Sequence, residues 1–481
     1  MRIFCSFFTL LFLLFVEKTV SQPSIERFLS AHYMKGASVS FMVKDILNDT
    51  VLYRYDADRE VTPASVMKIV TTATALEILG DLFRYETTIL YDGALKDSIL
   101  EGNLYIRGSG DPTLGSSEVG ADRDKIMRSW IKFLKSKGLR MVDGSVIADE
   151  SIFDSEGISL KLMLEDMGNY YAPGSYGINI FDNRYSLFLR TGELNSKPEI
   201  VRTDPIIPSL RFYNQLLTAQ SDKDSMYIAG FPFANERYLF GTVPANRSQY
   251  QLKGDIPEPS LFLAQYFTKL LQSDSIRVSG EPSCYRILSL HNDWQSQIRH
   301  SLMSSYSMPL KELVRITNFS SHNLYADILL KTMGLKNKSE VSASSFAKGV
   351  TIVKDFWEEK GLNTSSLWMY DGCGLAATDK LTASFVCELL TYMYKKSPYS
   401  KSFIESLPRA GMEGTVANML KSSSLHGVAH LKSGSMNRVR SYAGYILRDG
   451  KVYAVAILVN NFSCTQAQIK TDIEQLLLSL F

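Results

Sequence analysis

The chain has 481 residues, more than one hydrophobic core usually spans, so we expect two or more lobes. Apolar residues make up 45% and charged residues 21%, which is the balance of a folded globular protein and excludes a disordered one. Lys and Arg number 52 against 50 Asp and Glu, and the resulting formal charge of +2 argues against a nucleic-acid-binding protein.

The first 21 residues predict a secretory signal peptide. Arg2 precedes an apolar run from Ile3 to Val16, and small residues follow up to Ser21. Because the run is shorter than the roughly 20 residues that span a bilayer, we expect cleavage after Ser21 and export to the periplasm or cell envelope. An uncleaved membrane anchor is the alternative, and a peripheral association with the membrane is compatible with either.

Cysteine and histidine are sparse. The chain has 5 Cys, which excludes a disulfide scaffold, and no pair has the C-x-x-C spacing. Four of them follow the signal, and we expect small buried residues although disulfides could form after export: Cys284, Cys373, Cys387 and Cys464. His426 and His430 have the i, i+4 spacing of helical metal ligands, but Gly427 lies between them and a predicted strand follows. We therefore expect no metal and no cofactor.

Both ends of the mature chain predict strands and helices of one domain. Residues 37–43 and 50–55 alternate and read as a hairpin, and residues 66–79 form an apolar segment stopped by Gly80. Apolar or small residues cover nearly the whole circumference of that predicted helix, which indicates burial. Near the C-terminus, residues 429–435, 441–447 and 452–460 read as strands joined by an Asp449-Gly450 turn, and residues 466–480 as a helix.

The middle of the chain has a different sequence pattern. Short alternating stretches between Gly, Pro, Asp and Asn run from about residue 86 to 255, and helical periodicity returns at residues 259–272 and 310–333. We expect an α+β fold, an antiparallel sheet flanked by helices. Its discontinuous domain spans residues 22–85 and 256–481, and residues 86–255 form a β-rich insertion of one or two lobes.

Ser65 and Lys68 are the first candidate catalytic pair. They stand three residues apart at the start of the buried helix, so they share one face. An amine among apolar side chains favours its neutral form and becomes a base, which is what a serine nucleophile requires. The same S-x-x-K pattern occurs at Ser129–Lys132 and Ser345–Lys348, where neighbouring polar residues favour solvated helix faces.

Two further motifs follow in chain order. Ser321-His322-Asn323 precedes a predicted helix, and a hydroxyl and an amide at that place can face a cleft, although a plain N-cap explains them alone. Lys432-Ser433-Gly434 lies on a predicted strand, where Gly434 leaves space beside the backbone for a ligand. The set S-x-x-K, S-x-N and K-[S/T]-G, in this order, is typical of β-lactamases and penicillin-binding proteins.

With these motifs, the chain resembles the class C low-molecular-mass penicillin-binding proteins, a family of D-alanyl-D-alanine carboxypeptidases and endopeptidases. The long insertion between the first and second motifs is characteristic of that family and absent from single-domain β-lactamases. Further segments carry the likeness: Gly102–Leu114, Tyr170–Pro173 leading to Asp182-Asn183, Asp371–Leu375, and Leu407-Pro408 with Gly414-Thr415.

The resemblance implies a role for each motif. Ser65 is expected to be the acylated nucleophile, Lys68 its general base, and Ser321 the relay of a proton to the leaving amine. Asn323 is expected to hold the substrate amide. The implied substrates are peptidoglycan stem peptides, and β-lactam antibiotics are the implied covalent inhibitors.

The resemblance also implies how the substrate is held. Lys432 and Ser433 are expected to bind the terminal carboxylate of the peptide, and the backbone N–H groups of Ser65 and Ser435 to form the oxyanion hole. Asp182 is at the position associated with the amine of the diamino acid side chain.

Three residues depart from the family pattern. Ser433 stands where Thr is usual and keeps the hydroxyl, His322 stands where Asp is common and need not face the substrate, and Cys373 replaces the Ser of D-G-S-G, which predicts a weaker hydrogen bond there. The sequence thus predicts a serine-type D-Ala-D-Ala carboxypeptidase, with D,D-endopeptidase action possible. The alternatives are a non-catalytic peptidoglycan-binding protein, or a β-lactamase or esterase with the same nucleophile.

Overall fold

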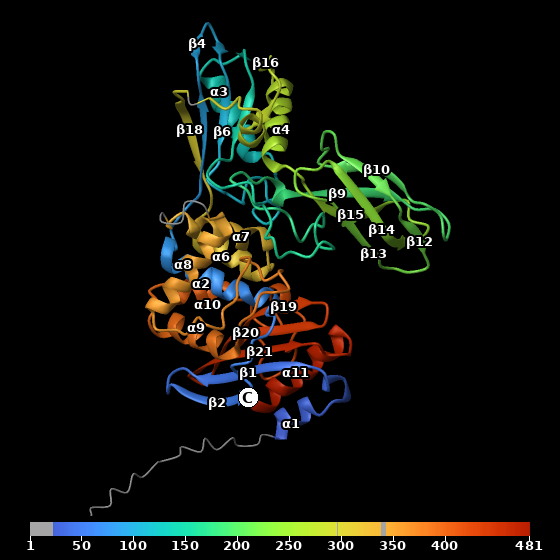
Figure 1. Ribbon diagram of the computed structural model, residues 1–481, viewed down its shortest axis with the longest axis vertical. Helices are drawn as coiled ribbons and strands as arrows, with labels where there is room; N and C mark the ends of the chain where they lie inside the picture. Colours follow the sequence, from blue (N-terminus) through green and yellow to red (C-terminus); the bar gives the residue numbers. More distant parts are fainter. Residues whose placement is uncertain (1–22, 296, 338–342) are drawn as a thin grey trace, which may run out of the picture.

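The computed structural model describes residues 23–295, 297–337 and 343–481, and the predicted signal peptide lies outside the described residues. Figure 1 shows an elongated molecule in which a sheet and its helices form one end, a second body forms the other, and a smaller β lobe projects sideways. Among the described helices, none has the length and apolar character needed to cross a bilayer.

The two ends of the chain meet in one antiparallel sheet. Its strand order is β19-β20-β21-β1-β2. Its strands are β1 (Ser38–Asp45), β2 (Thr50–Tyr55), β19 (Ala429–Met436), β20 (Val439–Arg448) and β21 (Lys451–Asn460). Phe41 of β1 pairs with Tyr55 of β2 on one side and with Ile457 of β21 on the other. The β20–β21 turn has φ of 51° at Asp449 and 71° at Gly450, the left-handed pair that an Asp-Gly hairpin adopts. The predicted sheet is therefore confirmed.

Helices cover both faces of this sheet, and each face has its own apolar cluster. One face is covered by α1 (Pro23–Leu29) and α11 (Gln466–Leu480). The other is covered by α2 (Met67–Leu79), α6 (Leu310–Phe319), α7 (Asn323–Gly334), α8 (Ser345–Glu359), α9 (Ala383–Lys395) and α10 (Ser400–Ser406). Short 3-10 turns are η1 (His32–Met34), η2 (Ala64–Val66), η3 (Phe181–Asn183) and η4 (Gly414–Val416).

Helix α2 is the buried helix that the sequence predicts. Every residue from Met67 to Leu76 is buried, and the helix lies between the sheet side and α6, α7 and α8 (Figure 1). The predicted start at Val66 falls in η2, so the helix itself begins one residue later. Because this part of α2 has no exposed face, all of its side chains are packed against neighbouring residues, and this includes Lys68.

The second body is built on two sheets with helices packed against them. The sheets have the orders β17-β8-β6-β3-β18 and β16-β7-β5-β4. Their strands are β3 (Glu86–Tyr91), β4 (Ala94–Lys96), β5 (Ile99–Glu101), β6 (Leu104–Arg107), β7 (Met141–Val142), β8 (Val146–Asp149), β16 (Arg277–Val278), β17 (Ser283–Cys284) and β18 (His300–Tyr306). The helices of this body are α3 (Lys125–Ser136), α4 (Pro259–Ser273) and α5 (Tyr285–Leu290).

The packing of this body continues past residue 255, where we expected the insertion to end. Helix α4 buries Phe262, Leu263 and Phe267 in the same apolar cluster as Ile89 and Trp130. Strand β18 then pairs along β3 before the chain enters α6. The expected boundary leaves α4 and β18 outside the insertion. A helical periodicity in the sequence does not indicate which core the helix packs against.

The side lobe is all β. One sheet has the order β10-β9-β15, and the other has β11-β14-β12 with β13 paired to β14. The strands are β9 (Arg184–Arg190), β10 (Glu199–Asp204), β11 (Arg211–Asn214), β12 (Leu217–Ala219), β13 (Ser225–Ala229), β14 (Glu236–Pro244) and β15 (Tyr250–Asp255). Inside it, the fully buried Arg237 guanidinium donates to Asp255 Oδ1 at 3.1 and 2.9 Å. The body and the lobe have separate sheets, but their buried apolar residues form one cluster.

A connecting segment, residues 150–180, links β8 to η3 without a helix or strand and runs along α7. Lys331 Nζ of α7 donates to the carbonyl oxygens of Glu156 and Ser175, both at 2.8 Å. Asn323 Nδ2, at the first residue of α7, donates to the Tyr171 carbonyl at 2.6 Å. The connecting segment therefore ties the insertion to the helix that follows the S-x-N motif.

The described cysteines are all free thiols. Cys284, Cys373 and Cys387 are buried, and Cys464 is partly exposed. This agrees with small core residues rather than paired ones.

Candidate active site

Ser65 lies on η2, the tight turn directly before α2, and its side chain is partly exposed. Two glycines let other segments approach this turn closely. A Cβ at Gly434 of β19 would stand 2.6 Å from the Pro63 carbonyl oxygen and 3.1 Å from the Ser65 nitrogen. A Cβ at Gly374, where φ is +80°, would stand 2.0 Å from the Ala64 carbonyl oxygen. The turn is therefore clamped between a strand and the Asp371–Leu375 loop.

Lys68, the second residue of α2, is fully buried. Its Nζ lies 2.9 Å from Ser65 Oγ, 2.6 Å from Asn323 Oδ1 and 2.7 Å from the Cys373 carbonyl oxygen. Burial lowers the pKa of the Lys68 ammonium, and the surrounding carboxylates only partly offset it. A neutral amine has two N–H donors and one lone pair. The amide and carbonyl oxygens accept the two N–H groups, which leaves the lone pair for the Ser65 hydroxyl proton.

The S-x-N motif lies where predicted, at the loop between α6 and α7. Ser321 has φ of 57°, a left-handed conformation that costs a non-glycine residue free energy and is common at active sites. Its Oγ accepts a hydrogen bond from Lys432 Nζ at 2.8 Å. Asn323 receives Lys68 on its oxygen and donates its amide to Tyr171. The structure thus brings Ser65, Lys68 and the two motif residues together.

Strand β19 presents its motif on both faces. Lys432 and Gly434 are buried, whereas Ser433 is partly exposed and Ser435 is exposed, which is the alternation that the sequence predicts. Lys432 Nζ also donates to the Ser433 carbonyl at 2.8 Å, and burial beside Lys68 lowers its pKa well below the usual value. Ser433 Oγ lies 2.7 Å from Thr415 Oγ1 of η4, so two hydroxyl groups stand together at the exposed edge.

A cavity of about 580 Å³ opens at the nucleophile. Ser65, Asn323 and Ser435 line it, together with Glu165 and Asp166 of the connecting segment. Its remaining lining residues are Thr62, Ala64, Met163, Tyr171, Gly374, Leu375, Ala377, Met436, Asn437 and Val439. Both acids in this lining were missed by the sequence reasoning. Their signal is an adjacent acidic pair shortly before Tyr170-Tyr171.

Asp182 does not line this cavity. It is 3% exposed, and its Oδ2 accepts from the backbone N–H and the hydroxyl of Ser117 at 3.2 and 3.0 Å. Its Oδ1 lies 3.4 Å from Nε2 of His322, which is equally buried. Asp182 therefore contacts the S-x-N motif through His322, outside the cavity. The acids that line the cavity are Glu165 and Asp166. His322 points away from the cavity, as expected.

Cys373, which replaces the Ser of the family pattern, contacts Lys68 through its backbone. The backbone carbonyl, not the thiol, meets the amine. Among the described residues, Asp327, Asp371 and Cys373 form a group whose geometry could hold a cation. Asp371 already accepts from the N–H groups of Cys373, Gly374 and Ala376, and Asp327 accepts from Gly372. These carboxylates shape the loop that holds Lys68.

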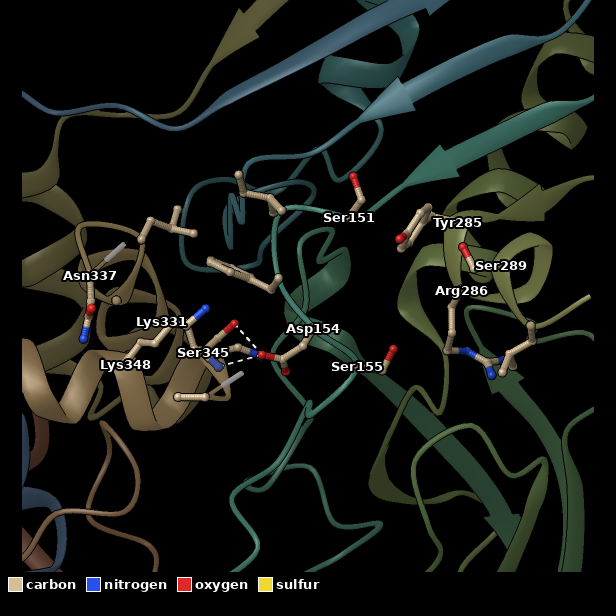
Figure 2. A pocket seen from close by; sticks show the side chains of 16 residues that line it. Ser151, Asp154, Ser155, Tyr285, Arg286, Ser289, Lys331, Asn337, Ser345 and Lys348 are labelled. Carbon is tan, nitrogen blue, oxygen red and sulfur yellow. Dashed lines mark hydrogen bonds between the residues drawn. The ribbon is translucent and has the colours of Figure 1, made fainter. Parts of the chain in front are cut away.

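The other S-x-x-K sequences are structural. Ser129 and Lys132 are exposed on α3, as expected. Ser345 differs from the expectation of a solvated face, because it is 8% exposed and donates both its N–H and its hydroxyl to Asp154 Oδ2, at 2.6 and 2.7 Å. Figure 2 shows this pair in the wall of a cavity of about 600 Å³ between α8 and the insertion. There, Lys331 is held by backbone carbonyls and Arg286 by Glu258.

Comparisons with known proteins agree with this geometry. Residues 21–479 match the family described as D-Ala-D-Ala carboxypeptidase 3 (S13). The chain is 25% identical over 456 residues to a D-alanyl-D-alanine carboxypeptidase of Actinomadura sp. strain R39, covering 92% of this chain and 82% of that protein. It is 24% identical over 444 residues to the D-alanyl-D-alanine carboxypeptidase DacB of Haemophilus influenzae, covering 91% and 88%.

The fold is shared with a solved structure. Penicillin binding protein 4 (dacB) of Haemophilus influenzae superposes with a TM-score of 0.79 at 21% identity, covering 93% of this chain and 96% of that one. The match over nearly the whole chain confirms the resemblance carried by the three motifs. The chain belongs to the D-Ala-D-Ala carboxypeptidase 3 (S13) family of serine peptidases.

Proposed function

We propose that the protein removes the terminal D-alanine from peptidoglycan stem peptides through an acyl-enzyme on Ser65, and that penicillins acylate the same hydroxyl. The observation that carries this proposal is Lys68. It is a fully buried amine whose two other neighbours are acceptors, and it lies 2.9 Å from a serine hydroxyl that opens into a cavity. That arrangement is an activated nucleophile.

Acylation follows from these contacts. Ser65 Oγ attacks the carbonyl carbon of the penultimate D-alanine as its proton passes to Lys68 Nζ, giving a tetrahedral oxyanion. The backbone N–H groups of Ser65 and Ser435 are the donors for that oxyanion, since β19 approaches the nucleophile turn at Gly434. When the C–N bond breaks, the leaving nitrogen takes a proton through the Ser321 hydroxyl, and free D-alanine departs.

Deacylation is the reverse use of the same groups. Water adds to the ester carbonyl and gives a proton to Lys68 Nζ, the bond between Ser65 Oγ and the carbonyl carbon breaks, and Lys68 returns the proton to Ser65 Oγ. When the leaving or attacking amine belongs to a neighbouring stem peptide, the same steps give D,D-endopeptidase or transfer chemistry. No separate residue is required for either reaction.

The carboxylate end of the substrate is assigned to Ser433 and Thr415, whose hydroxyls stand together at the exposed edge of β19. Lys432 supplies positive charge from the buried side through its contact with Ser321. A carboxylate arriving there favours the protonated form of Lys432, whose pKa burial otherwise depresses. Asn323 keeps Lys68 in place and offers its amide to the substrate backbone.

The cavity at Ser65 is acidic. Glu165 and Asp166 line it and, among the described residues, no Lys or Arg does, so it suits the free amine of a diamino acid side chain. Asp166 Oδ1 accepts from the Tyr171 hydroxyl at 2.9 Å, and burial raises its pKa. A bound ammonium group would lower that pKa again. This subsite replaces the one that the sequence predicts at Asp182.

The predicted N-terminal signal and the proposed peptidoglycan substrate together support action in the periplasm or cell envelope.

The experiment compares covalent labelling by a fluorescent penicillin in the wild-type protein, Ser65→Ala and Ser129→Ala, measured by intact mass. Ser129 is the matched control, since it belongs to an S-x-x-K sequence on an exposed helix face. We expect an adduct in the wild type and in Ser129→Ala, and none in Ser65→Ala. A folded wild-type protein without an adduct or turnover indicates the non-catalytic binding protein. Rapid penicillin turnover indicates a β-lactamase, and hydrolysis of simple esters but not of D-Ala-D-Ala peptides indicates an esterase.

A further inference from the structure

His322 and Asp182 form a buried pair directly behind the S-x-N motif. His322 is the residue between Ser321 and Asn323, and Asp182 belongs to η3 of the insertion. His322 Nε2 and Asp182 Oδ1 are 3.4 Å apart, and neither atom has a hydrogen-bond partner elsewhere in the described chain. A buried carboxylate oxygen and a buried imidazole without other partners are each costly, so their mutual contact stabilises both.

The backbone on both sides of the pair is strained. Phe181, Asp182 and Asn183 have φ of 54°, 57° and 52°, and Ser321 has φ of 57°. Left-handed conformations at non-glycine residues persist only where the surroundings determine them. Side-chain amides hold the η3 turn: Asn183 Nδ2 donates to the Gly174 carbonyl and to Asn179 Oδ1, both at 2.8 Å. The turn thus presents the Asp182 carboxylate at a fixed place.

We infer that His322 and Asp182 are positioning residues, a contact through which the insertion holds Ser321 and Asn323 in register with Ser65 and Lys68. The inference rests on the proposed function, because it concerns the geometry of acylation. Any displacement of His322 moves its two chain neighbours, and through them the partners of Lys432 and Lys68. Neither His322 nor Asp182 touches the substrate cavity.

The charges around the imidazole give the pair a distinct chemical signature. Asp182 of η3, Arg184 at the start of β9, Glu118 of the loop after β6 and Tyr325 of α7 are the titratable groups around it. Burial lowers the pKa of His322, so the imidazole is neutral at neutral pH, whereas the His322 contact lowers the pKa of Asp182 despite burial. The native contact is therefore a neutral imidazole facing a carboxylate. A second carboxylate in place of His322 faces like charge.

The test measures the second-order rate constant of acylation by a fluorescent penicillin for His322→Asp, His322→Asn and the double variant His322→Asp with Asp182→Asn. The rate is followed across acidic to alkaline pH, together with thermal unfolding. His322→Asn keeps a donor and is expected to stay close to the wild type. His322→Asp is expected to lose about 10- to 100-fold at neutral pH, as for a reacting group displaced by up to about 1 Å. Relative to the wild type at the same pH, the His322→Asp variant should recover at acidic pH, where the two carboxylates share a proton, and the double variant should match the wild type at all pH values.

The outcomes separate the inference from the function on which it rests. A wild-type protein that is not acylated refutes the proposed function. Normal acylation of the wild type with no loss in His322→Asp refutes the positioning role. A loss in His322→Asp that neither acidic pH nor Asp182→Asn relieves also refutes it, because a cavity or a packing defect alone has no such dependence. If His322→Asp does not fold, a His322→Asn variant with impaired acylation and a normal unfolding temperature overturns the proposed complementarity.

Discussion

Replacing Gly434 by alanine is expected to slow acylation about a hundredfold while leaving the protein folded. The added Cβ stands 2.6 Å from the Pro63 carbonyl oxygen, about 0.8 Å short of the 3.4 Å at which ordinary contact begins. Ser65 N and Ala64 Cβ, at 3.1 and 3.2 Å, block the alternative movements. Because the obstacles are backbone atoms or lie next to the nucleophile, β19 or the Ser65 turn must shift by most of that distance. A misplacement of about 1 Å costs a reaction about 100-fold.

The cost of the same substitution to stability leaves the protein folded. Overpacking a buried site typically costs about 1–3 kcal/mol, against a total stability of about 5–15 kcal/mol for a folded domain. The assay is the second-order rate constant of acylation by a fluorescent penicillin, with thermal unfolding measured on the same preparations. Gly36→Ala is the matched control, since its added Cβ meets nothing within 4 Å. Acylation of Gly434→Ala at the wild-type rate refutes the argument that the glycine permits a close approach.

Three further predictions follow from the site. Since burial lowers the pKa of Lys68, the acylation rate should rise with pH and reach its plateau below the usual lysine pKa of 10.5; a plateau reached only near 10.5 contradicts a neutral Lys68 base. Asp166→Asn should lower kcat/KM for stem peptides with a free side-chain amine about tenfold more than for their N-acetylated forms, because a charge-assisted contact is lost; equal effects on both contradict the acidic subsite. Cys373→Ser should leave acylation unchanged, because the backbone carbonyl holds Lys68; a large loss shows that the thiol takes part.

The sequence predicts the elements that carry chemistry because their patterns are local. The apolar circumference of residues 66–79 indicates a buried helix, and burial of Lys68 follows from it. The alternation along residues 432–435 likewise places Lys432 and Gly434 on one face. These predictions need only the period of a helix or a strand.

What the sequence does not predict depends on the path of the chain between elements. Asp182 was assigned to the cavity by family resemblance, but the left-handed turn at residues 181–183 directs it toward His322. Glu165 and Asp166 lie in a segment without periodicity, and an adjacent acidic pair alone does not place two residues at a cavity. The end of the insertion was missed for the same reason, since α4 carries an ordinary amphipathic pattern and packs on the insertion rather than on the sheet from the chain ends.

Hydrogen bonds tie the insertion to α7, the helix that carries Asn323 of the active site. The buried Lys331 ammonium depends on the carbonyls of Glu156 and Ser175, the Tyr325 hydroxyl donates to Ser116 Oγ, and the Asn323 amide donates to Tyr171. Removing the insertion leaves each of these groups without its partner, at about 1–3 kcal/mol for each that stays buried. All three residues lie on α7, which begins at the S-x-N motif. A chain without the insertion must therefore lose Lys331 and Tyr325 as well, or the helix that presents Asn323 to Lys68 does not keep its place.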